Sequence, residues 1–261
     1  MPAVRRARAA ALGTALLTTV TLLAGGCSGT GGGAAADPAP RPGPVLLVPG
    51  YGGSTAALQP LAERLGAEGR DATVVALPGD GTGDLAVSAA ALATAVDAAL
   101  ERTRAAAADV VGYSAGGVVA RLWVAGGGAD VARRVVTLGS PHHGTTLADL
   151  AAGLAPERCP EACRQLGTAS PVLAALNAGD ETPAGPDWVS IWTTGDETVR
   201  PPGSARLEGA LDLPVQSVCG DARVGHTDLP RDRLVQAMVV TQLGAGAPVP
   251  LGPDDCARLT G

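Results

Sequence analysis

The chain has 261 residues, of which 46% are hydrophobic, so it is long and apolar enough to form one domain with a substantial core. Aromatic residues make up only 2% and Phe is absent, so we expect a core of Val, Leu and Ala. The formal net charge is −6 and no basic patch is evident, which excludes a typical nucleic-acid-binding surface.

The first residues have the pattern of a signal peptide. "MPAVRRARAA" is a positively charged start, and "ALGTALLTTVTLLAGG" is an apolar stretch with small residues at its end. This stretch is too short and too poor in large apolar residues to predict a membrane-spanning helix. We therefore predict a signal peptide over residues 1–26 and an exported protein.

The sequence "LLAGGC" resembles the lipobox of bacterial lipoproteins, which implies a lipidated Cys27 and a membrane-anchored protein. Cleavage by an ordinary signal peptidase, giving a fully secreted protein, is the alternative. Residues 28–44 are rich in Gly, Ala and Pro, as in a flexible tether. We thus expect a lipidated cysteine and linker over 27–44 and a catalytic domain over 45–261.

Four further cysteines remain in the expected mature chain: Cys159, Cys163, Cys219 and Cys256. An even number of cysteines in an exported chain predicts two disulfides. The sequence does not fix the connectivity, but proximity favours Cys159–Cys163 and therefore Cys219–Cys256. A metal site is disfavoured because only three histidines are present and no C-x-x-C spacing occurs.

From residue 45 onward, short apolar runs alternate with helical patterns. This alternation predicts an α/β fold with a mostly parallel central sheet and helices on both faces. The region 141–187 is longer and more polar, with a single helical pattern. The predicted strands are 45–48, 72–77, 109–112, 133–140, 188–195 and 214–219, and the predicted helices are 59–69, 86–105, 114–127, 170–177 and 230–243.

The stretch "GYSAG", residues 112–116, fits the motif G-x-S-x-G between a predicted strand and a predicted helix. In that setting Ser114 occupies a sharp, strained turn and is a candidate nucleophile. Glycine is expected at 112 and 116 because the turn leaves no room for a Cβ. Gly117 is expected to let the helix lie close to the sheet. An ordinary strand-to-helix turn is the alternative interpretation.

A serine hydroxyl needs a nearby base to become a good nucleophile. In chains with this strand–serine–helix turn, the order along the sequence is serine, acid, histidine. His226 lies in "DARVGHTDLP", between the last predicted strand and the last predicted helix, and is the candidate base. His142 and His143 either line the site or serve as structural loop residues.

The candidate acid is Asp196, immediately after the predicted strand "WVSIWTTG", with the adjacent Glu197 as the rival. A carboxylate there would fix the tautomer of His226 and stabilise its imidazolium form. Two backbone N–H groups should stabilise the oxyanion of the transition state, one from Ala115 and one from Tyr51 in "VPGYGG". A plain glycine-rich turn is the alternative for that loop, and a phosphate cradle is disfavoured because no Lys follows.

With these residues placed, the chain resembles the α/β-hydrolase lipases and esterases, in particular small secreted bacterial lipases of class 2. The resemblance runs from about Val45 to Leu243. It implies hydrolysis of carboxylic esters, often acylglycerols, through an acyl-enzyme and without a cofactor. Many members have His-Gly where this chain has Pro49-Gly50, and Tyr113 replaces the histidine common before the nucleophile. The motifs that carry the resemblance are "VLLVPGYGGS", "DVVGYSAGGVVARLWV", "RRVVTLGSPHHGT", "SPVLAALNAGDE", "WVSIWTTGDETVRPPGSARL" and "VGHTDLP".

The resemblance assigns Ser114 as nucleophile, Asp196 as acid and His226 as base, and it implies an acyl ester or lipid as substrate. We also expect the protein to be a monomer. The segment 145–187 is long enough to border the acyl pocket. The same site is also compatible with acyl transfer to another acceptor or with thioester or amide hydrolysis. A non-catalytic binding lipoprotein of this fold is the alternative from another class.

Overall fold

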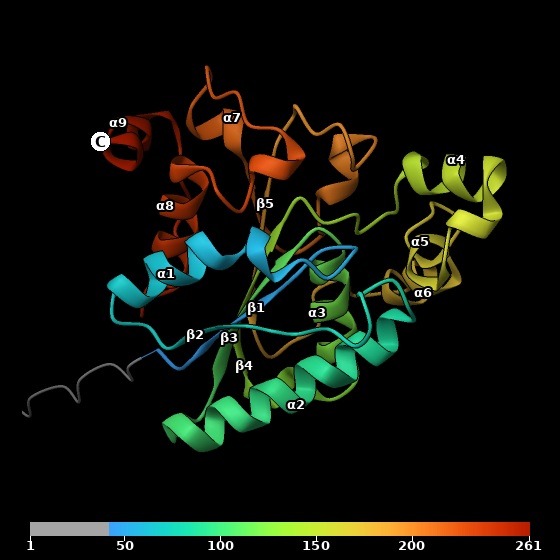
Figure 1. The fold of residues 1–261 in the computed structure, drawn as a ribbon. Coiled ribbons are helices and arrows are strands. Elements are labelled where there is room, and N and C mark those ends of the chain that lie inside the picture. Colours follow the sequence, from blue (N-terminus) through green and yellow to red (C-terminus); the bar gives the residue numbers. More distant parts are fainter. Residues whose placement is uncertain (1–41) are drawn as a thin grey trace, which may run out of the picture. The chain divides into compact units, whose positions relative to one another are not determined.

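The computed structural model describes residues 42–261, whose centre is a six-stranded parallel sheet (Figure 1). The strand order is β2-β1-β3-β4-β5-β6, and every neighbouring pair is parallel. The predicted α/β fold with a parallel sheet is therefore confirmed. The strands are β1 (Val45–Val48), β2 (Ala72–Val74), β3 (Ala108–Tyr113), β4 (Ala132–Leu138), β5 (Asp187–Trp192) and β6 (Leu211–Pro214).

Helices cover both faces of this sheet (Figure 1). Helices α1 and α8 pack together on one face, while α2 and α3 pack together on the other. Pro60 lies in the first turn of α1, where its missing N–H costs no helical bond. The helices are α1 (Gln59–Ala67), α2 (Leu85–Thr103), α3 (Ala115–Ala125), α4 (Thr146–Leu154), α5 (Glu161–Gln165), α6 (Pro171–Leu176), α7 (Val215–Val218), α8 (Arg233–Gln242) and α9 (Cys256–Thr260).

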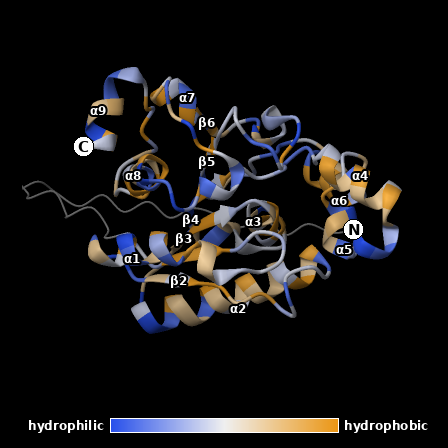
Figure 2. Ribbon diagram, turned by 45° about the horizontal axis from the view of Figure 1, so that its top comes forward, coloured by the Kyte–Doolittle hydropathy of each residue, from blue (hydrophilic) through white to orange (hydrophobic). Residues whose placement is uncertain are grey.

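The two cores follow from the alternation of side chains along each strand. In β1, Val45 and Leu47 join the core under α1 and α8, whereas Leu46 and Val48 join the core under α2 and α3. Because both faces are covered, β1 is buried and apolar throughout. The apolar strands between the helix layers are visible in Figure 2.

The structure corrects the sequence prediction at two places. The predicted strand 214–219 is wrong, because β6 ends at Pro214 and residues 215–218 form the short helix α7. The side chain of Gln216 on that turn accepts from the N–H of Thr194 and thereby contacts the end of β5. The region 141–187 contains α4 and α5 as well as the predicted helix near 170–177.

A buried charge cluster lies at the amino ends of the strands. Asp109 of β3 is fully buried and pairs with Arg70 at 2.6 Å and with Arg133 at 2.5 Å. Both arginines also donate to the carbonyl oxygen of Leu243, just after α8. The cluster therefore ties the end of α8 to the sheet edge opposite the carboxyl ends of the strands.

Both predicted disulfides are present, Cys159–Cys163 and Cys219–Cys256. In the part of the chain from residue 42 onward, none of the helices has the length and apolarity needed to cross a bilayer. The predicted signal peptide 1–26 and the predicted lipidation site Cys27 lie outside the described residues, as does most of the predicted linker 27–44.

Candidate active site

Ser114 sits on a strained turn between β3 and α3. Its φ of 53° and ψ of −124° lie in a region that side-chain-bearing residues rarely adopt. A Cβ on Gly112 would lie 2.5 Å from the carbonyl oxygen of Gly116, and one on Gly116 would overlap the carbonyl oxygen of Val48. Both glycines thus have the steric role expected of them. A Cβ on Gly117 would overlap Ser140, which follows β4, so Gly117 does allow close helix–sheet packing.

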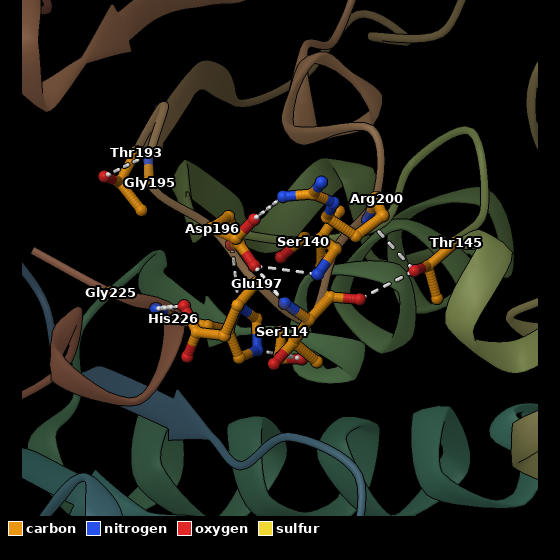
Figure 3. Close-up of polar contacts among 12 residues, drawn as sticks. Ser114, Ser140, Thr145, Thr193, Gly195, Asp196, Glu197, Arg200, Gly225 and His226 are labelled. Atoms are coloured by element: carbon orange, nitrogen blue, oxygen red, sulfur yellow. Dashed lines mark hydrogen bonds and ion pairs between the residues drawn. The ribbon is translucent and has the colours of Figure 1, made fainter.

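The structure brings Ser114, His226 and Asp196 into one hydrogen-bonded chain (Figure 3). Ser114 Oγ lies 2.9 Å from His226 Nε2, and His226 Nδ1 lies 2.7 Å from Asp196 Oδ2. All three residues are buried. They come from the carboxyl ends of β3 and β5 and from the loop before α8, so the parallel sheet itself gathers them at one edge.

The carboxylate of Asp196 is oriented by the loop that carries it. Its Oδ1 accepts from the N–H groups of Thr198 at 2.9 Å and Val199 at 2.7 Å. Oδ2 is left to accept from the Nδ1–H of His226, which places the other ring nitrogen, Nε2, as an acceptor facing Ser114. Thr145, the cap of α4, accepts from the N–H of Arg200 and donates to the carbonyl oxygen of Thr198, which anchors this loop from the other side.

Three contacts hold the loop of His226. The N–H of His226 donates to Glu197 at 3.1 Å, and the N–H of Gly225 donates to Asp228 at 3.1 Å. Burial, and secondarily the charge of Asp196, raises the pKa of Tyr113 to about 12. The Tyr113 hydroxyl therefore stays protonated and donates to the carbonyl oxygen of His226 at 3.2 Å.

Sequence reasoning missed these supporting roles. It named Glu197 only as a rival acid, whereas the side chain contacts the backbone of His226 and not its ring. It named Tyr113 only as a replacement, whereas its ring packs 5.3 Å from the imidazole, centre to centre. The only available signal was the position of each residue next to a member of the predicted triad.

The loop after β1 lies beside Ser114. A Cβ on Gly50 would lie 3.0 Å from the Cβ of Ser114, so a larger residue at position 50 would require a shift of a few tenths of an ångström. The N–H of Tyr51 donates to no protein group of residues 42–261. Ala115 is the first residue of α3, where a backbone N–H has no acceptor within the helix.

A cavity of about 240 Å³ opens beside Ser114. Its wall includes Leu147, Ala148 and Ala151 of α4, so the segment after β4 borders it, as expected from the sequence. The lining contains no residue of α6, so only the earlier part of the segment 145–187 borders this cavity. The remaining lining residues are Tyr51, Ser114, Pro141, Thr145, Arg158, Cys163, Leu166, Thr198 and Val199.

His142 and His143 make no hydrogen bond to Ser114, His226 or Asp196. His142 is fully buried against Thr137, and burial together with the charge of Arg121 lowers its pKa well below the ordinary value. His143 lies 2.9 Å from Glu181. Within residues 42–261, no group of three or more His, Cys, Asp or Glu side chains is placed to hold a metal ion.

A parallel sheet, a serine on a strained turn and a Ser–His–Asp hydrogen-bonded chain together are typical of the α/β-hydrolase fold. The family model described as Lipase (class 2) matches residues 91–214. Over these residues the chain is similar to the class 2 lipases, and its fold is that of the α/β hydrolases. The sequence-based resemblance is confirmed.

Solved structures show the same fold. Lipase B of Aspergillus fumigatus superposes with a TM-score of 0.66 at 19% identity, over 84% of this chain and 60% of that one. The mature form of the lipase BlEst2 of Bacillus licheniformis gives 0.63 at 21% identity, over 79% of this chain and 96% of that one. The chain thus spans about 60% of the length of the fungal lipase. No curated protein matches the sequence significantly.

Proposed function

We propose that the chain is an exported serine esterase or lipase in which Ser114, His226 and Asp196 form the catalytic triad. The observation that carries the proposal is the hydrogen-bonded chain from Ser114 Oγ through both ring nitrogens of His226 to the Asp196 carboxylate. Its position beside an apolar cavity supports an acyl ester or lipid substrate.

In the first half of the reaction, Ser114 Oγ attacks the ester carbonyl carbon while Nε2 of His226 takes its proton. The carbonyl π electrons move to oxygen, and the N–H groups of Tyr51 and Ala115 stabilise that oxyanion. The tetrahedral intermediate collapses, the C–O bond to the alcohol breaks, and Nε2 returns its proton to the departing alkoxide. The acyl group remains on Ser114.

In the second half, a water molecule attacks the acyl-enzyme while Nε2 takes one of its protons. A second oxyanion forms in the same place, the bond to Ser114 Oγ breaks, and the proton passes to Oγ. Asp196 remains ionised throughout and stabilises the imidazolium that forms in each half. The products are a carboxylic acid and an alcohol, and no cofactor is required.

A fluorophosphonate probe tests the proposed nucleophile directly. We expect one equivalent of probe on the wild-type protein, on the tryptic peptide that contains Ser114. The variant His226→Ala should react much more slowly, because Ser114 then lacks its base. Absence of labelling in a folded wild-type protein would refute the catalytic proposal and favour a binding protein of this fold.

We further propose that the protein is anchored at the membrane surface through a lipidated Cys27. The two disulfides support an oxidising compartment outside the cytoplasm. Replacing Cys27 with alanine should move the protein from the membrane fraction to the soluble exported fraction, as measured by fractionation and immunoblotting. Unchanged membrane retention of the variant would contradict lipidation and leave another anchoring route.

A further inference from the structure

The wall of the cavity beside Ser114 contains a single charged residue, Arg158. The rest of the lining is apolar or uncharged. Arg158 follows α4 in the short helical turn 156–158, so it comes from the segment that supplies the apolar wall. The proposed steps of ester hydrolysis give no role to a cationic residue in the lining of an otherwise uncharged cavity.

Arg158 is also unpaired among residues 42–261, where its side chain makes no ion pair or hydrogen bond. The neighbouring Arg164 provides a contrast, since it pairs with Glu161 at 2.6 Å. Arg158 is exposed and lines the cavity, so its guanidinium is free to meet a ligand there. An ordinary solvated surface arginine is the competing explanation, and the experiment below separates the two.

The backbone that carries Arg158 is well anchored. The next residue, Cys159, is fully buried and is linked by a disulfide to Cys163 of α5. The carbonyl oxygen of Cys159 accepts from Arg164 at 2.5 Å, and the N–H of Arg158 donates to Ala155 at 2.8 Å. The start of the Arg158 side chain is therefore fixed relative to the cavity, which lowers the entropic cost of using it in recognition.

We propose that Arg158 selects esters that carry an anionic group, a carboxylate or a phosphate, in addition to the ester bond. The guanidinium matches such groups with two parallel N–H donors, and the apolar wall beside it takes the hydrocarbon part of the same substrate. The formal net charge of the chain is −6, so selectivity for an anion must come from a local cation and not from the overall field. This inference rests on the proposed function and adds a substrate class to it.

The test compares esters that differ only in an anionic group. On the acyl side, the 4-nitrophenyl half-ester of adipic acid is paired with 4-nitrophenyl hexanoate, and the half-ester of suberic acid with the octanoate. On the alcohol side, 4-acetoxybenzoate is paired with 4-acetoxybenzamide. The measured quantity is the ratio of kcat/KM for the anionic ester to kcat/KM for its neutral partner.

In Arg158→Gln we expect this ratio to fall about tenfold on at least one side, as for the loss of a charged hydrogen bond. The side on which it falls identifies the part of the substrate that carries the anion. Arg158→Lys should retain part of the preference, and added salt should reduce the wild-type ratio. Arg102→Gln is the matched control, because Arg102 is exposed, pairs with Asp71 and lies at the far end of α2.

A ratio that is the same in wild type and in Arg158→Gln on both sides would overturn the inference, as would an equal fall in the Arg102→Gln control. An equal loss of activity on both esters of a pair would give Arg158 a purely structural role and would also overturn it. A folded wild-type protein that hydrolyses none of the esters would instead refute the proposed function on which the inference rests.

Discussion

Replacing Ser114 with alanine should lower kcat/KM on short-chain 4-nitrophenyl esters by about 10⁴-fold or more. The variant loses the Oγ that attacks the carbonyl carbon, and no covalent intermediate can form. The fold should be retained, because serine and alanine both carry a Cβ on the strained backbone at φ 53°. Initial rates and the thermal midpoint of the same preparation check both parts.

Ser140→Ala is the matched control for this prediction. Ser140 is a buried serine near the same turn, and its Oγ donates at 3.5 Å to Gly112 and not to His226. Loss of the Ser140 hydroxyl in this variant should change kcat/KM by less than about tenfold. If Ser114→Ala kept wild-type activity, Ser114 would not be the nucleophile.

Asp196→Asn should lower kcat by about 10⁴-fold while leaving the structure intact. Oδ1 of Asp196 accepts two backbone N–H groups, from Thr198 and Val199, and only the oxygen of an asparagine can replace it there. The NH₂ group of the asparagine would then face Nδ1 of His226. Nδ1 must become an acceptor, so Nε2 carries the proton and can no longer take one from Ser114.

Glu197→Gln separates the two candidate acids in this loop. Glu197 contacts only the backbone N–H of His226, and a glutamine oxygen can still accept that bond. We expect activity of this variant to stay within about tenfold of wild type. Steady-state kinetics of both variants decide the assignment. A large loss in Glu197→Gln together with a small loss in Asp196→Asn would reverse it.

The parts of the site that sequence reasoning located are those tied to the ends of strands. Ser114 lies in a motif between a strand and a helix, and Asp196 directly follows β5, so the topology of a parallel sheet places both at one edge. Arg158 could not be found this way. Its place in the cavity wall depends on how α4 and the turn after it pack beside Ser114, and no short sequence pattern encodes that contact.

The errors in the fold have equally local causes. The apolar residues Val215 and Val218 lie in a run that is typical of a strand, but Pro214 closes β6 and Gln216 turns toward Thr194. Helices α4 and α5 were missed because Pro156 and Pro160 divide the region into short pieces whose apolar period is too brief to identify. Asp109 was read only as part of a strand, since its two arginine partners come from distant parts of the chain.

The segment between β4 and β5 supplies much of the cavity wall but none of Ser114, Asp196 and His226. The hydrogen bonds that orient Asp196 and His226 run within and between their own two loops, and the β4–β5 segment contributes Thr145, just before α4, as an anchor. Substrate preference and bond cleavage therefore depend largely on different parts of the chain. During evolution, changes in the sequence or length of the stretch from α4 to α6 can alter the substrate, while the three residues that cleave the bond stay the same.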